Sequence, residues 1–155
     1  MSSQQARLIW LLCYAALVLG LILGGYPLVF STDTISYFRV AEHYANGDWA
    51  TAINGYWSPL FSWLMLPGML LGLSTPVAAQ LVSILAGWAF LEMLWRLSGR
   101  LGLRSRWRLG LQLALLPFLI GFGLLEFMAD VPAAACLLLF VDQLTRPAVR
   151  SSFWA

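Results

Sequence analysis

Long apolar runs separated by short polar segments constrain this chain most strongly. The longer runs cover residues 8–30, 77–97, 109–125 and 131–145. A helix needs roughly 20 mostly apolar residues to cross about 30 Å of hydrocarbon, and these runs approach or exceed that length. Charged residues make up only 10% of the sequence, too few for the surface of a soluble domain. The sequence therefore predicts an all-α membrane protein.

A shorter apolar run at 60–73 decides the topology, because counting it as a span inverts everything after it. Pro67 and Gly68 interrupt this run, which is too short for a comfortable crossing. If it does not cross, all arginines except Arg39 lie on one side, in the loop 98–108 and its flanks, near residue 7 and in the tail 146–155. Basic residues gather on the cytoplasmic side of membrane proteins. We therefore expect four transmembrane helices, cytoplasmic termini, and a long external first loop that contains juxtamembrane helices.

The first part of this external loop, which covers residues 31–76, has the pattern of a helix. Asp33 or Thr32 is a candidate N-cap, and Asn46-Gly47 is a candidate end. Between them, Tyr37, Val40 or Ala41, and Tyr44 recur at helical spacing. The simplest interpretation is an amphipathic helix on the membrane surface. Such a helix can also present Asp33 at its start.

A series of motifs follows the first apolar run. It consists of Asp33-x-x-x-Tyr37, then Gly47-Asp48-Trp49, then residues 54–60 with the sequence Asn-Gly-Tyr-Trp-Ser-Pro-Leu, and finally Asp130 shortly before Pro132. In order and placement, it resembles the opening module of the GT-C glycosyltransferases. The likeness is greatest to bacterial relatives of the protein O-mannosyltransferases and of the lipid A aminoarabinose transferases, and it covers roughly residues 8–145.

Three features depart from that family. Many relatives carry Asp-Glu at the start of the loop, where this chain has Asp33-Thr34. Aminoarabinose transferases have a lysine before the loop proline, where this chain has Ser58. Full-length members are also much longer than 155 residues. The resemblance therefore implies an N-terminal module, which is a fragment, a truncated gene product or one piece of a larger assembly. Its site would need further transmembrane helices.

The resemblance also implies a reaction, namely sugar transfer from a polyprenyl-phosphate donor at the external face of a bacterial inner membrane. Asp33 is the candidate general base. Asp130 would orient the acceptor, or join Asp33 in holding a divalent cation. Tyr37, Arg39 and Trp57 are the candidate substrate contacts, and no nucleic-acid partner is expected.

Each of these residues has a structural alternative. Asp33 and Asp130 could simply cap helices, Arg39 could contact lipid headgroups, and Trp57 could anchor the chain at the interface. Glu92–Arg96 and Asp142–Arg146 have the i,i+4 spacing of structural ion pairs. The alternative function is a non-catalytic multispan subunit or a transporter-like protein. Transport would favour ionisable residues near the centres of the spans, where this sequence has none.

Overall fold

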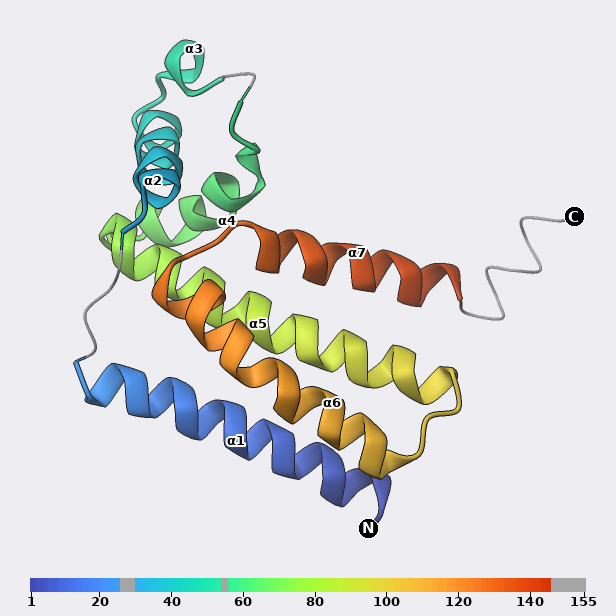
Figure 1. Cartoon of the computed structure of the whole chain (residues 1–155). Coiled ribbons are helices and arrows are strands. Elements are labelled where there is room, and N and C mark those ends of the chain that lie inside the picture. The colour runs from blue at the N-terminus through green and yellow to red at the C-terminus, as the bar shows by residue number, and fades with distance from the viewer. Residues whose placement is uncertain (26–29, 54–55, 146–155) are drawn as a thin grey trace, which may run out of the picture.

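The computed structural model of the chain describes residues 1–25, 30–53 and 56–145. Every regular element in these ranges is a helix. Four long segments form a bundle, and three shorter helices gather at one of its ends (Figure 1). The long segments are α1 (Ser3–Leu23), α5 (Thr75–Arg100), α6 (Ser105–Phe118) with its continuation η1 (Leu119–Leu125), and α7 (Asp130–Leu144). The shorter helices are α2 (Thr32–Ala45), α3 (Trp49–Ala52) and α4 (Pro59–Leu70).

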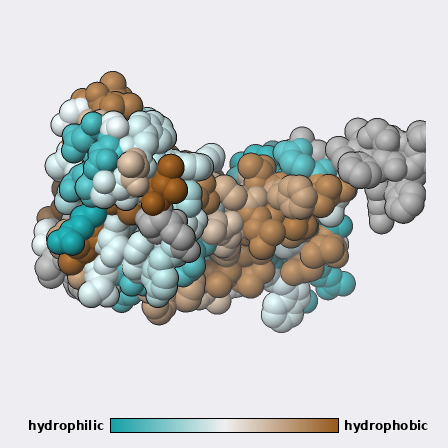
Figure 2. Space-filling view, turned by 90° about the horizontal axis from the view of Figure 1, so that it is seen from above, coloured by the Kyte–Doolittle hydropathy of each residue, from teal (hydrophilic) through white to brown (hydrophobic). Residues whose placement is uncertain are grey.

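Three segments of the described chain are long and apolar enough to cross a membrane, namely Ser3–Leu23, Thr75–Arg100 and Ser105–Leu125. The prediction of an all-helical chain with membrane-spanning helices is confirmed to this extent. α4 has 12 residues, fewer than a span needs. α7 has 15 residues and runs beside α5, away from the short helices (Figure 1). Apolar surface extends along the bundle, and hydrophilic residues gather towards its two ends (Figure 2).

The helix boundaries differ from the predicted ones for local reasons. α1 begins at Ser3 because Ser2 and Gln5 form a capping box ahead of it. α5 continues to Arg100, so the predicted loop 98–108 contracts to a tight turn in which Gly102 takes a φ of +80°. The predicted helix 109–125 changes from α to π geometry just after Pro117, whose missing N–H interrupts the α-helical hydrogen bonds. Residues 26–29 and the tail 146–155 lie outside the described chain.

The predicted N-cap of α2 is wrong, whereas its predicted end is confirmed. Ser31 is the cap, because its backbone is extended and its Oγ accepts a hydrogen bond from the Thr34 N–H at 3.2 Å. Thr32 and Asp33 already lie in the helix. Asn46 and the following glycine, with a φ of +76°, end α2 as expected. The expected stripe packs inward, with Val40, Ala41 and Tyr44 buried.

Within the described chain, every arginine except Arg39 lies at the bundle end away from α2, α3 and α4 (Figure 1). We call this end the arginine end, and the opposite one the site end. The Glu92 side chain is only 2% exposed and pairs with Arg7 of α1 at 2.8 Å. It also pairs with Arg96 at 2.7 Å, which confirms the predicted i,i+4 pair. Glu92 thus joins α1 to α5.

Two further contacts at the arginine end hold α6 and α7 to α5. Asp142 is fully buried and pairs with Arg100 at 3.1 Å, while Arg146, its predicted partner, lies outside the described residues. The Arg108 guanidinium lies 3.8 Å from the centre of the Trp95 ring and donates to the Trp95 carbonyl at 2.6 Å. Carboxylates at this end therefore fasten helices together.

The helices pack closely between the two ends. Trp10, Tyr14, Leu91 and Trp95 belong to one buried apolar cluster. The Tyr14 hydroxyl donates to the Ile84 carbonyl at 2.7 Å. That hydroxyl lies 2.6 Å from where a side chain would begin at Gly87, so any other residue there would displace the Tyr14 ring from this position.

Candidate functional site

The link between η1 and α7 is fastened to the first turn of α2. Thr34 is almost fully buried, and its hydroxyl donates to the Glu126 carbonyl at 2.6 Å. Phe127 is completely buried and has a φ of +52°, a strained backbone conformation for an aromatic residue. Its ring packs 6.2 Å from the ring of Phe30 and 5.9 Å from that of Phe38. These contacts place the start of α7 against the start of α2.

The two candidate catalytic carboxylates line one hollow as a result. Asp33, Thr34 and Tyr37 of α2, together with Glu126 and Asp130, line one hollow of about 120 Å³ at the site end. Asp33 and Asp130 are both exposed, and neither forms an ion pair within the described chain. We call this hollow the acidic pocket. Its carboxylates are therefore free to contact a ligand.

Neither carboxylate is the capping residue that the structural alternative requires. Ser31 caps α2. α7 begins at Asp130 itself, after Ala129, and no side chain donates or accepts a capping bond there. Both aspartates still lie in the first turn of a helix, where the helix dipole favours negative charge by about 0.3–1 kcal/mol. That effect does not explain why the two face one hollow.

Tyr37 lines the same hollow as the two acids. Burial raises the pKa of its phenol above the ordinary value of 10.0, and the negative charges of Asp130 and then Asp33 raise it further. Tyr37 therefore keeps its proton at neutral pH and can donate a hydrogen bond into the acidic pocket. Its ring makes edge contacts with Trp57 at 5.3 Å and Phe61 at 5.7 Å.

The other two predicted substrate contacts lie outside the acidic pocket. Trp57 packs on Tyr37 but does not line the acidic pocket. Arg39 is exposed on α2 and does not line it either. Asn54 and Gly55 of the predicted motif lie outside the described chain. In the described ranges, no group of three or more metal-ligating side chains lies close enough together to hold an ion. A cation at this place would have two carboxylates, and water or substrate oxygens would complete its shell.

The sequence did not identify Thr34 and Phe127 as residues that hold the acidic pocket together. Thr34 precedes Tyr37 and Ala41 at helical spacing, so the buried stripe of α2 already pointed to it. Its acceptor at Glu126 and the positive φ of Phe127 depend on tertiary contacts and leave no local signal.

An apolar hollow adjoins the acidic pocket. It has a volume of about 180 Å³, and its lining includes three rings from neighbouring helices, those of Phe90, Phe118 and Phe122. Met128 and Asp130 line both hollows. A ligand with its polar group in the acidic pocket could therefore place an attached apolar chain beside η1 and α7.

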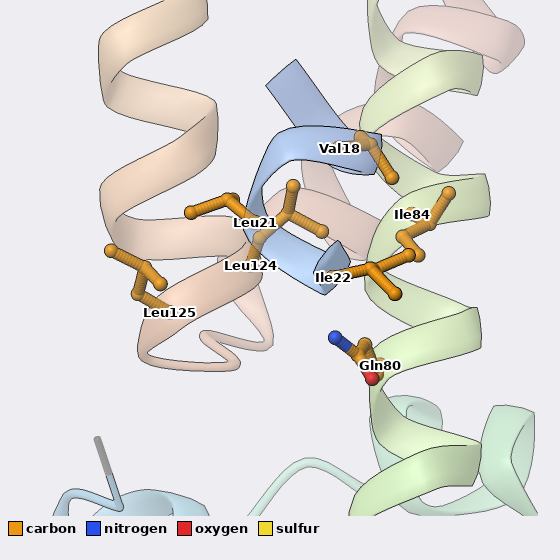
Figure 3. A pocket seen from close by; sticks show the side chains of 7 residues that line it. All are labelled: Val18, Leu21, Ile22, Gln80, Ile84, Leu124 and Leu125. Atoms are coloured by element: carbon orange, nitrogen blue, oxygen red, sulfur yellow. The ribbon is translucent and has the colours of Figure 1, made fainter. Parts of the chain in front are cut away.

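A third hollow, between α1, α5 and η1, is not a ligand site. All of its lining side chains are aliphatic except that of Gln80 (Figure 3). Its volume is about 20 Å³, enough for about one water molecule. We interpret it as a packing gap.

Comparison with models of known protein families, with curated proteins and with solved structures finds no match to this chain. The described residues define an all-helical protein with three candidate membrane spans and an acidic pocket at one end of its bundle.

Proposed function

We propose that this chain is the N-terminal part of a GT-C-type membrane glycosyltransferase, which moves a sugar from a polyprenyl-phosphate donor to an acceptor at the external membrane face. One observation carries the proposal. Asp33 and Asp130, which are far apart in the sequence, line the same pocket at the end of a bundle of apolar helices. A lipid-linked donor requires such a position, because its phosphate and sugar emerge from the bilayer at the interface.

The arrangement of charge supports the orientation. Arginine-rich segments stay on the cytoplasmic side of a membrane, so the arginine end would face the cytoplasm and the acidic pocket the exterior. α7 would be the fourth span, since it leaves the pocket beside α5 and its Asp142 meets Arg100 at the arginine end. In this orientation α2, α3 and α4 are the juxtamembrane helices of an external loop. Both termini would then lie in the cytoplasm, and the membrane would be the inner membrane of a bacterium.

The pocket suits general-base catalysis of sugar transfer. Asp33 would accept the proton of an acceptor hydroxyl or amine while the acceptor atom bonds to the anomeric carbon. The bond from that carbon to the phosphate oxygen breaks, and its electrons leave with the polyprenyl phosphate. Asp130 would orient the acceptor, and the Tyr37 phenol can donate a hydrogen bond to a sugar or phosphate oxygen.

The adjoining apolar hollow would hold the first part of the polyprenyl chain, because Asp130 lines both hollows and aromatic rings line this one. No cation lines the acidic pocket in the described chain. A divalent ion on Asp33 and Asp130 would stabilise the leaving phosphate. The pocket's volume of about 120 Å³ is also smaller than the roughly 300–1,000 Å³ of typical ligand sites. These residues would thus form one wall of a site that further helices complete.

The test replaces Asp33 and Asp130 separately by Asn in the natural protein that carries this sequence, and measures sugar transfer in membranes. We expect each change to lower the rate, with Asp33→Asn losing about 100-fold or more, the usual contribution of a general base. Asp48→Asn is the matched control. Asp48 is an exposed carboxylate at the site end that caps α3, and Asn caps helices equally well.

Unchanged transfer in both variants would overturn the catalytic assignment and favour the non-catalytic subunit. An equal loss in the Asp48→Asn control would indicate a general effect of charge at the site end. Thermal unfolding of each variant in detergent separates loss of activity from loss of fold.

A further inference from the structure

The arginines at the arginine end divide into two groups. Arg7, Arg96 and Arg100 pair with buried carboxylates, and Arg108 lies on the Trp95 ring. The remaining two, Arg104 and Arg106, are exposed and form no ion pair within the described chain. The guanidinium of Arg106 lies 5.5 Å from the ring centre of Trp107. The first four arginines therefore hold helices of the bundle together, whereas Arg104 and Arg106 do not.

The two exposed arginines lie at a hollow with apolar surroundings. Arg104 and Arg106, together with Met1 and Ser105, line an open hollow of about 410 Å³. Three large apolar side chains of the same segment point to the surface. They are Leu101, Leu103 and Trp107, with exposed fractions of 71%, 39% and 63%. Two unpaired positive charges are therefore flanked by exposed apolar groups at the end of a membrane-spanning bundle.

We propose that this surface, formed by Arg104, Arg106 and Trp107, binds the headgroup phosphate of an anionic phospholipid. Guanidinium groups bind phosphate oxygens in a bidentate geometry. No carboxylate among the described residues neutralises them. A zwitterionic lipid brings its own cation and gains less from two arginines. The exposed leucines and Trp107 fit the glycerol and acyl region, since tryptophan settles at membrane interfaces. A soluble phosphate would leave this apolar flank in water.

The inference is independent of the proposed glycosyltransferase reaction, because it needs only a chain embedded in a bilayer. It predicts a lipid bound at a defined place on the side of the membrane opposite to the acidic pocket. Each basic residue near an anionic surface contributes roughly fivefold to binding. Losing both arginines should therefore weaken the binding of anionic lipid about 25-fold.

The experiment uses the whole chain purified in a neutral detergent, with native mass spectrometry to count bound lipids. Phosphatidylglycerol, phosphatidylcholine and inorganic phosphate are titrated separately. The variants are Arg104→Gln with Arg106→Gln, each single change, and, as the control, Ser105→Ala, which changes an uncharged residue of the same hollow. We expect tight binding of one phosphatidylglycerol, about fivefold weaker binding in each single arginine variant, about 25-fold in the double variant, and no change in Ser105→Ala.

Three results would overturn the proposal. The first is equal affinity for phosphatidylglycerol and phosphatidylcholine, and the second is unchanged affinity in the double variant. The third is inorganic phosphate binding as tightly as the lipid, which would indicate a site for a soluble anion. Thermal unfolding of the lipid-free protein should be the same with and without the two arginines, because they make no internal ion pair.

Discussion

Glu92 offers the sharpest test of how the bundle is held together. Its buried carboxylate accepts from Arg7 through two nitrogens, at 2.8 and 3.2 Å, and from Arg96 at 2.7 Å. The carboxylate is 2% exposed, whereas the side chains of Arg7 and Arg96 are 47% and 45% exposed. The loss of stability on replacing any of these three residues therefore depends on which charge remains inside the protein without a partner.

The expected costs form a series. Arg7→Gln or Arg96→Gln alone leaves Glu92 with one partner, and should lower the free energy of unfolding by about 1 kcal/mol, a value reduced for solvent screening. Glu92→Gln releases two half-exposed arginines to water and should cost about 2 kcal/mol. The double variant Arg7→Gln with Arg96→Gln strands a buried carboxylate and should cost about 3–5 kcal/mol. That exceeds the sum of the single changes by about 1–3 kcal/mol.

The assay is reversible unfolding in mixed micelles, in which the fraction of denaturing detergent is raised and helix content is followed by circular dichroism. The coupling between Arg7 and Arg96 is the quantity of interest. Strictly additive single and double variants would refute the argument, because they would mean that Glu92 finds water or another partner when both arginines are gone. A larger cost for either single variant than for the double would refute it too.

Two further predictions concern close contacts. A side chain at Gly99 would begin 2.9 Å from the Arg108 guanidinium, which would have to shift and weaken its contact with Trp95. Gly99→Ala should therefore cost about 1 kcal/mol in the same assay, whereas Gly110→Ala, which meets nothing within 4 Å, should not destabilise the protein. Equal effects of both changes would contradict this. Asp130→Asn should lower the pKa of Tyr37 towards 10.0, measured as tyrosinate absorbance against a Tyr37→Phe reference. Because folding raises the pKa of Tyr37, the stability that its phenol contributes is present below pH 10.0 and is lost as the pH rises through the folded value. An unchanged pKa would mean that Asp130 does not face the phenol.

The elements that could be predicted from sequence are those that local pattern determines. Apolar runs predict helices because a chain in hydrocarbon must satisfy its backbone hydrogen bonds internally. The i,i+4 spacing was enough to predict the pairing of Glu92 with Arg96. The cap of α2 could not be chosen in the same way, because Ser31, Thr32 and Asp33 are all good capping residues. The contact of Thr34 with Glu126 is long-range and accompanies the cap at Ser31.

The acidic pocket was predicted only in part, and for the same reason. The predicted topology and the family resemblance led us to expect Asp33 and Asp130 on one face of the membrane, but neither argument brings two residues within reach of one hollow. A buried threonine and an aromatic residue with positive φ do that, through contacts between distant segments. The contact through which a residue supports a site can therefore be invisible in a single sequence even where the acids it positions are not.

Asp33 and Asp130 differ sharply from the two buried carboxylates of the arginine end, and this contrast is the main structural argument for a site. At the arginine end, Glu92 and Asp142 are buried and each is paired with arginine, as fastening requires. At the site end, Asp33 and Asp130 are exposed, cap no helix, form no ion pair in the described chain, and share a hollow. Carboxylates that stabilise a fold are expected to form ion pairs or helix caps within it. These two are held in place by the fold and left available, which is the arrangement that binding or proton transfer needs.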